Sequence, residues 1–264
     1  MNLLWNLPLG LTLGFVIGMT GTGGGALLLP LLIGVFKMDP LTAVGTGLIF
    51  SVVTRLTAVI IHFRMKTVRL RRSIFVLLGS LPSVLISAKI LHDLSGKHSS
   101  DLIHSYLENA IGIILMVTAG LMIFQIRFLK DEQRNHAIEE SRNQPVPAPK
   151  KISAVLGGVL VGILTGTTSV GGGVLIVPLF MGLLDASCVQ AVGSSIFISL
   201  LLSASGGLVY LYYGHIVVSN TSLLCLASVP GVIFGSRLSG KIPEVLLVSV
   251  VAALLILGGI GLLV

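Results

Sequence analysis

The stretch GTGGGALLLP, residues 21–30, interrupts the first long apolar segment of the chain with closely spaced glycines. A related stretch, GTTSVGGGVLIVP at residues 166–178, interrupts a second apolar segment in the same way. Shifting the numbering by 148, from Gly23 to Gly171, aligns the glycine triplets and the proline that follows each of them. The tetrapeptides AVGT and AVGS align at the same offset, so the sequence predicts two homologous repeats.

The composition is typical of an integral membrane protein. Hydrophobic residues make up 54% of the 264-residue chain and charged residues only 10%, whereas a soluble domain is about 25% charged. Several apolar segments reach the roughly 20 residues that cross a bilayer as a helix. The formal charge of +7 comes mainly from basic loops, which fits the positive-inside rule and does not indicate nucleic-acid binding. We therefore predict an all-α polytopic membrane protein.

The pattern of apolar segments divides the chain into two transmembrane repeats and a linker. We expect the first repeat at residues 1–128, a polar linker at 129–150 and the second repeat at 151–264. Each repeat holds about four helical segments, the first of which is broken at its glycines. The most basic loop, residues 64–72, and the lysines and arginines of the linker predict that both lie in the cytoplasm. The expected location is a prokaryotic inner membrane.

The glycine-broken segments allow two topologies. If each segment crosses the membrane, the chain has about eight spans and the repeats are parallel. If each is a re-entrant hairpin whose arms meet at the midplane, the repeats are inverted. The loop at residues 237–241 lies outside in the first case and in the cytoplasm in the second. Its two basic residues, Arg237 and Lys241, slightly favour inverted repeats.

The glycine breaks themselves predict an anion site. Backbone that is unwound at membrane depth must line a cavity or be buried in protein, because lipid cannot satisfy its N–H groups. Consecutive glycines leave those amides uncovered, and a helix that starts after them directs its positive dipole end at the break. Two such breaks would form a small site near the midplane that suits an oxyanion. The alternative is that glycines only allow close helix packing, which we favour for Gly14 and Gly18.

The predicted substrate site combines the breaks with nearby hydroxyls and one arginine. Arg55 is the one strong charge inside a span, and such charges commonly mark substrate pathways or gating pairs. Thr46 and Ser194 occupy matching positions beside a glycine, whereas Arg55 is matched by Ser203, so the site is not symmetric there. The candidate substrate-binding residues are Gly23, Gly24, Gly25, Thr20, Thr46, Arg55, Ser169, Gly171, Gly172, Gly173, Ser194 and Ser195.

The ordered set of motifs resembles the sulfite exporter TauE/SafE family, also called the 4-toluene sulfonate uptake permease family. The resemblance rests on GTGGGALLLP, AVGTGL, HFRMKTVRLRR and GSLPS in the first half, and on SVGGGVLIVP, AVGSSI, YYGHI and SVPGVIFGSRL in the second. It implies secondary transport of small sulfur-containing or organic anions, such as sulfite, sulfoacetate or sulfonates, by alternating access. Ser83 departs from the pattern where the second half has Gly231, and Arg55 is not part of the pattern.

Other functions receive less support from the residues. An anion channel of the same architecture is the main alternative, and saturable flux with counterflow would distinguish a carrier from it. An intramembrane serine protease is disfavoured, because no G-x-S-x-G motif lies near a deep histidine. Cys188 and Cys225 have no metal-ligand spacing, so no metal or other cofactor is expected. The expected partners are a small anionic substrate and the lipid bilayer, and a homo-oligomer is compatible with the sequence.

Overall fold

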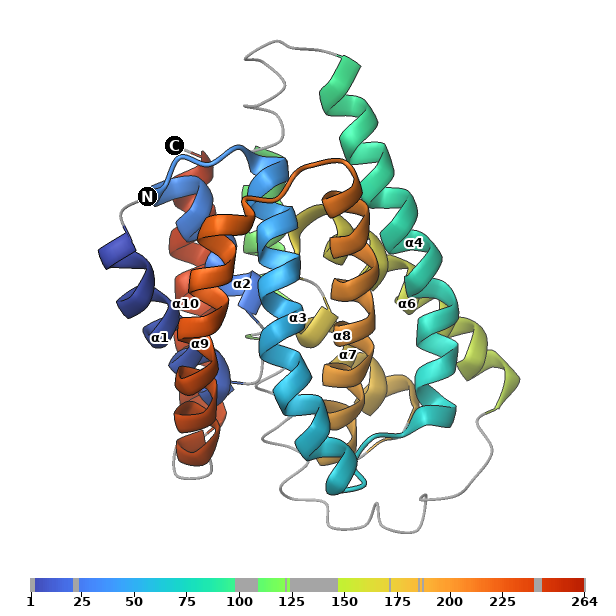
Figure 1. The fold of residues 1–264 in the computed structure, drawn as a ribbon. Coiled ribbons are helices and arrows are strands. Elements are labelled where there is room, and N and C mark those ends of the chain that lie inside the picture. The colour runs from blue at the N-terminus through green and yellow to red at the C-terminus, as the bar shows by residue number, and fades with distance from the viewer. Residues whose placement is uncertain are drawn as a thin grey trace.

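Figure 1 shows the computed structural model of the chain as a bundle of helices. The structure describes residues 3–20, 24–97, 109–121, 123, 147–170, 172–184, 186, 188–239 and 244–263. All the regular elements within these ranges are helices. The all-α prediction is therefore confirmed for this part of the chain.

Ten helical elements carry labels, and four helices are long and apolar enough to span a bilayer. In chain order the labelled elements are α1 (Leu3–Thr20), α2 (Gly24–Pro30), the π-helix η1 (Leu31–Val35), α3 (Pro40–Arg64), α4 (Leu70–Lys97), α6 (Ala148–Thr168), α7 (Gly172–Leu184), α8 (Cys188–Tyr212), α9 (Val218–Ser239) and α10 (Glu244–Leu263). A shorter apolar helix spans Asn109–Leu121. The four candidate spans among the described residues are Pro40–Arg64, Leu70–Ser95, Pro149–Thr168 and Gln190–Tyr212.

Large apolar side chains cover the outside of the bundle. On α6, the side chains of Ile152, Leu156 and Leu160 are more than 60% exposed, and Ile74 and Leu78 of α4 are more than 50% exposed. Continuous apolar surface of this kind is rare on a soluble monomer. It suits contact with lipid chains, in agreement with an integral membrane protein.

The two central helices, α3 and α8, lie side by side and run antiparallel (Figure 1). A Cβ atom built on Gly45, near the start of α3, would lie 2.9 Å from the Cβ atom of Tyr210 at the end of α8. A Cβ atom built on Gly193, near the start of α8, would lie 3.2 Å from Nδ1 of His62 at the end of α3. These two contacts are equivalent under the 148-residue shift, because it places Gly45 on Gly193 and His62 on Tyr210.

The outer helices connect the two halves in the same reciprocal way. α1 of the first half packs along α9 of the second, and α6 of the second half packs along α4 of the first. A Cβ atom built on Gly14 would lie 2.8 Å from Cα of Ser228, and one built on Gly162 would lie 2.9 Å from Cα of Ser80. Such backbone contacts require a small residue, so the close packing expected at Gly14 is present.

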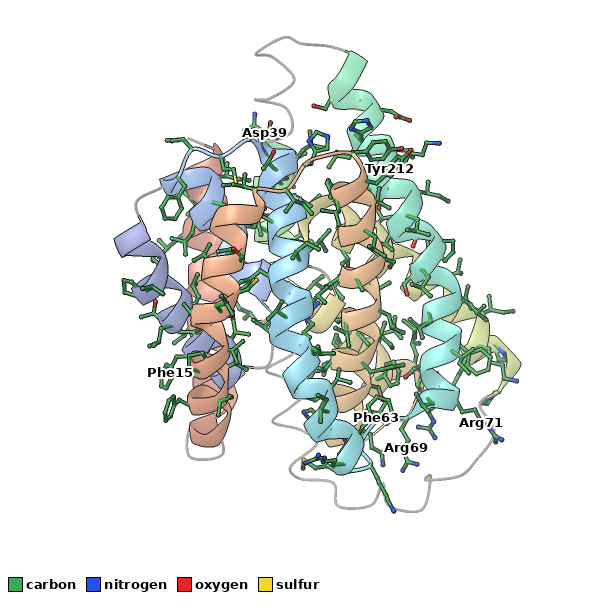
Figure 2. All side chains as sticks on the ribbon, in the orientation of Figure 1. Phe15, Asp39, Phe63, Arg69, Arg71 and Tyr212 are labelled. Atoms are coloured by element: carbon green, nitrogen blue, oxygen red, sulfur yellow. The ribbon has the colours of Figure 1, made fainter. Side chains whose placement is uncertain are left out.

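The bundle has two chemically different ends. In Figure 2, Arg69 and Arg71 lie beside Phe63 at one end, while Asp39 and Tyr212 lie at the other. We call the first the basic end, because it carries the loop that joins α3 to α4. We call the second the histidine end, because the side chains of His92 and His215 meet there.

Each broken segment begins and finishes at the same end. α6 begins at the basic end, where Nζ of Lys151 lies 5.4 Å from the ring centroid of Phe75. α7 finishes there, because the carbonyl of Leu184 accepts a hydrogen bond from Arg72. In the first half, Cβ atoms built on Gly10 and Gly14 would meet Ala227 and Ser228 in turn, so α1 runs parallel to α9 and starts at the same end. The segment finishes at Asp39, at the histidine end (Figure 2). The breaks therefore lie inside the bundle.

Candidate functional site

The two helix breaks meet at Ser169. This residue caps the end of α6 in the left-handed conformation, with a φ of 57°. A Cβ atom built on Gly25 of α2 would lie 2.8 Å from Oγ of Ser169, and one built on Gly47 of α3 would lie 2.7 Å from it. Real Cβ atoms do not approach so closely. Ser169 of the second half thus fills space that two glycines of the first half leave open.

On the first-half side, the protein satisfies the start of α2 itself. The first N–H groups of a helix have no partner inside the helix. The backbone N–H of Gly25 donates a hydrogen bond to Oγ of Ser51 on α3, at 2.7 Å. Ser51 is fully buried, so this hydroxyl acts as a cap supplied by another helix.

On the second-half side, the equivalent hydroxyl is used differently. Ser199 on α8 corresponds to Ser51 under the 148-residue shift. A Cβ atom built on Gly172, at the start of α7, would lie 2.6 Å from Oγ of Ser199. This Oγ atom is buried and has no hydrogen-bond partner within the described ranges. The hydroxyl of Ser199 therefore lies at the start of α7 but, unlike that of Ser51, does not cap the helix.

Arg55 links α3 to the second break. Its side chain is 3% exposed, and its Nη1 atom donates to the carbonyl of Ser199 at 3.1 Å and to Oγ of Ser203 at 2.8 Å. Ser203 is the repeat counterpart of Arg55, so these two matched positions face each other where α3 crosses α8. An arginine stays protonated in proteins, and it brings a fixed positive charge next to Ser199.

Three buried hydroxyls of α3, α8 and the end of α6 have no protein partner among the described residues. The Oγ atoms of Ser169 and Ser199 and the Oγ1 atom of Thr46 are buried and unpaired within the part of the chain that the structure describes. Thr46 precedes Gly47, which contacts Ser169. Buried polar groups are usually hydrogen-bonded, and each hydroxyl can donate one hydrogen bond. We call Arg55, Ser169 and Ser199 the serine–arginine cluster, and its donors and single charge suit a small oxyanion.

Two predicted hydroxyls form their contacts elsewhere. Oγ of Ser194 accepts a hydrogen bond from the backbone N–H of Arg69 at 3.0 Å, at the basic end. Oγ of Ser195 donates to the carbonyl of Val192 at 2.8 Å, within its own helix. Neither contact leads to the helix breaks.

The remaining predicted residues are glycines and one threonine of the breaks. Gly172 and Gly173 are buried in the first turn of α7. Thr20 ends α1 and Gly24 begins α2. Gly23 and Gly171 lie outside the described residues.

The candidate list left out Gly47, Ser51, Ser199 and Ser203, although the sequence identified Ser51 and Ser199 as hydroxyls near the breaks and Ser203 as the counterpart of Arg55. The repeat offset contained a signal for two of them, because it aligns Ser51 with Ser199 at equal distances from the glycine triplets. The contact of Gly47 with Ser169 joins the two halves, and no pattern within one half indicates it.

Comparison with known proteins agrees with a membrane transporter. The chain matches the family model described as Sulfite exporter TauE/SafE over residues 7–262. It is 32% identical over 256 residues to the probable membrane transporter protein YjnA of Bacillus subtilis (strain 168), with 97% of each chain covered. It is 27% identical to YunE of the same organism and 25% identical to MJ0441 of Methanocaldococcus jannaschii, both also named as probable membrane transporter proteins. These matches cover 89% and 90% of this chain and 86% of each relative. No solved structure gives a significant match.

Proposed function

Because the chain belongs to the TauE/SafE sulfite exporter family, we propose that it carries small sulfur-containing or organic oxyanions through the serine–arginine cluster. The family and the relatives are membrane transporters, so the chain is a transporter and not an enzyme. The proposed substrate class is sulfite, sulfoacetate or a small sulfonate.

The observation that carries the proposal is the convergence of both breaks at Ser169. The unpaired hydroxyls of Ser169 and Ser199 lie beside Gly25 and Gly172. The start of α7 attracts anions through its first N–H groups and dipole, whereas the N–H of Gly25 in α2 is already bonded to Ser51. Arg55 on α3 reaches the carbonyl of Ser199, beside the start of α7. Several donors around one positive charge match an oxyanion, whose oxygens each accept more than one hydrogen bond.

We propose further that the repeats are inverted and that each broken segment is a re-entrant hairpin. The antiparallel pairing of α3 with α8 supports this arrangement, as do the reciprocal contacts of α1 with α9 and of α6 with α4. Both ends of the α6–α7 segment lie at the basic end. The repeats would occupy residues 1–128 and 151–264, with 129–150 as the linker.

Alternating access follows from the same symmetry. The end of α8 closes on Gly45 at the histidine end, and the end of α3 closes on Gly193 at the basic end. These two closures are equivalent contacts in opposite orientations. We propose that the transporter opens them in turn, so that the serine–arginine cluster faces one side of the membrane at a time.

The proposed orientation places the basic end in the cytoplasm. Arg64, Lys66, Arg69, Arg71 and Arg72 cluster in the loop there, and positive loops stay on the cytoplasmic side. α6 also starts at this end, which puts the linker before it in the cytoplasm. The membrane would be the inner membrane of a prokaryotic cell.

A reconstituted transport assay tests the function. Liposomes that contain the purified protein should take up labelled sulfite, sulfoacetate or a small sulfonate with saturable kinetics, and preloaded unlabelled anion should accelerate entry. Saturation with counterflow supports a carrier, whereas single-channel currents would show the alternative anion channel. Failure of folded protein to move any of these anions would contradict the proposal.

A further inference from the structure

The histidine end contains a pair of imidazoles outside the serine–arginine cluster. Nδ1 of His92 on α4 lies 2.9 Å from Nε2 of His215, in the turn between α8 and α9. The ring of Tyr213 stacks on His92 with the ring centroids 3.8 Å apart. The pair therefore joins α4 to the turn that closes the end of α8.

The short distance limits how many protons the pair can hold. A hydrogen bond between two imidazole nitrogens needs one N–H donor and one acceptor, so a single proton lies between the facing nitrogens. One additional proton can bind a ring nitrogen that faces away, and the bond then persists with one positive charge. A second additional proton places N–H groups on both facing nitrogens, which breaks the bond and sets two cations side by side.

The surroundings favour the first positive charge more than the second. Burial lowers the pKa of His215 and the neighbouring His92 lowers it further, while the Asp39 carboxylate acts in the opposite direction. Oδ2 of Asp39 also accepts hydrogen bonds from the N–H and hydroxyl of Thr42, both at 3.1 Å. A single carboxylate can offset one imidazolium but not two. The other titratable or charged groups that neighbouring elements bring to this end, among the described residues, are Lys37, Lys89, Asp93, Tyr210, Tyr212 and Tyr213.

The turn that carries His215 is connected to the transport site through Tyr210. The N–H of His215 donates to the carbonyl of Tyr210 at 2.9 Å, and Oη of Tyr210 donates to the carbonyl of Gly166 at 2.7 Å. Gly166 lies about one helical turn before Ser169 on α6. The same turn packs on Gly45 at the start of α3. Movement of this turn would thus act on α3 and on α6. These two helices carry Ser51 and Ser169, which lie on either side of Gly25 in the first break.

We propose that the His92–His215 pair is a proton-binding site of the transporter, and that its second positive charge opens the histidine end. This inference rests on the proposed transport function. The neutral and singly charged pair keeps α4 joined to the turn after α8. The doubly charged pair separates, which releases the turn from Gly45 and gives the anion access to Ser169.

The basic end lacks this device within the described residues. Thr67 stands where the shift places His215, and His62 stands where it places Tyr210. Nδ1 of His62 lies 3.0 Å from Oγ1 of Thr67, so the equivalent turn is closed by one imidazole and a hydroxyl. A protonated His62 can still donate to Oγ1 of Thr67, so a proton does not break this contact, and His62 provides a matched control.

The test compares H92Q and H215Q with H62Q, because a glutamine amide can donate and accept hydrogen bonds but does not titrate. Exchange of a labelled small sulfonate is measured in liposomes with equal pH on both sides. Each variant's flux is divided by the wild-type flux at the same pH, which cancels any effect of pH on the substrate. We expect this ratio to fall about tenfold between about pH 6.5 and about pH 4.5 for H92Q and H215Q, because burial and the neighbouring imidazole lower the pKa of His215 below its ordinary value of about 6.5. For H62Q the ratio should stay constant. A constant ratio for H92Q and H215Q would overturn the inference while the transport function stands.

A measurement without transport separates the two proposals. Imidazole nitrogen resonances of 15N-histidine-labelled protein in nanodiscs should show His92 and His215 titrating in two coupled steps. Either glutamine variant should leave its partner with a single step. Independent titration of the two rings in the wild type would overturn the inference, even if no sulfonate flux were found. Absence of flux together with coupled titration would contradict the transport function alone.

Discussion

The two helix breaks share a backbone plan but differ in their polar chemistry. At the first break, Oγ of Ser51 accepts a hydrogen bond from the N–H of Gly25. At the second, Ser199 keeps an unpaired hydroxyl and its carbonyl binds Arg55. The repeat counterpart of Arg55 is Ser203, so the positive charge exists once. If the two halves are repeats, as we propose, both supply a helix start, while the arginine comes from the first half and the free hydroxyl of Ser199 from the second.

The largest effect should follow from filling the space between the breaks. In G25A the new methyl would lie 2.8 Å from Oγ of Ser169 and 3.0 Å from Oγ of Ser51, and overpacking of this kind costs about 1–3 kcal/mol. The neighbouring serines must move to make room for the methyl group. We expect flux per folded protein to fall by about 100-fold, because a small displacement of binding groups has an effect of this size. Gly34 has no atom within 4 Å of its Cβ position, so G34A is the control. Equal flux in G25A and G34A would contradict the role of the first break.

Removing the single charge should have the next largest effect. Hydrogen bonds to charged groups contribute about 1.5–3 kcal/mol, so R55A should raise the KM for the anion by about 10- to 100-fold. R55K should recover part of the loss, since it keeps the charge but not the fork of donors. An unchanged KM in R55A, measured by uptake at varied anion concentration, would show that Arg55 only holds α3 against α8.

Alanine at the two matched serines should separate structure from binding. S51A leaves the N–H of Gly25 without its cap, so we expect a loss of about 1–3 kcal/mol in stability. S199A removes a hydroxyl that no described group uses, so thermal stability should hardly change while KM rises about 2- to 10-fold. Thermal unfolding and uptake kinetics of both variants check this difference. The reverse pattern would assign binding to the first break.

The smallest effect concerns the two ends of the bundle and the dependence of stability on pH. The pKa of His215 is lowered from its ordinary value, mainly by burial. The unfolded chain then binds more protons than the folded one at acidic pH, so this contribution is complete above about pH 6.5. It is lost as the pH falls toward the folded pKa. The apparent Tm of the wild type should therefore drop on acidification more than that of H215Q.

Much of the fold could be predicted because it depends on local patterns. Glycine triplets interrupt helices wherever they occur, and α7 begins within the predicted triplet at Gly172. The spacing of Gly14 from Gly18 indicated close packing, and the contact of Gly14 with Ser228 has that character. Apolar length and composition were sufficient to predict a helical membrane protein.

The site was predicted only in part, because it depends on how the halves cross. Thr46 and Ser194 align in sequence, yet Ser194 binds Arg69 at the basic end. Since α3 and α8 are antiparallel, equivalent positions near their starts lie toward opposite ends. Positions near the crossing point meet instead, as Arg55 and Ser203 do. The 148-residue offset identifies equivalent residues, but it does not tell where along their length α3 and α8 cross.

The exchange of outer helices between the halves affects how the protein is made. The face of α4 around Ser80 packs on Gly162 of α6, and the face of α1 around Gly14 packs on Ser228 of α9. Synthesis proceeds from the N-terminus, so the first half enters the bilayer before either partner helix exists. Insertion and final packing are therefore separate events for this chain. Its assembly is complete only after α9 has been made and has reached α1.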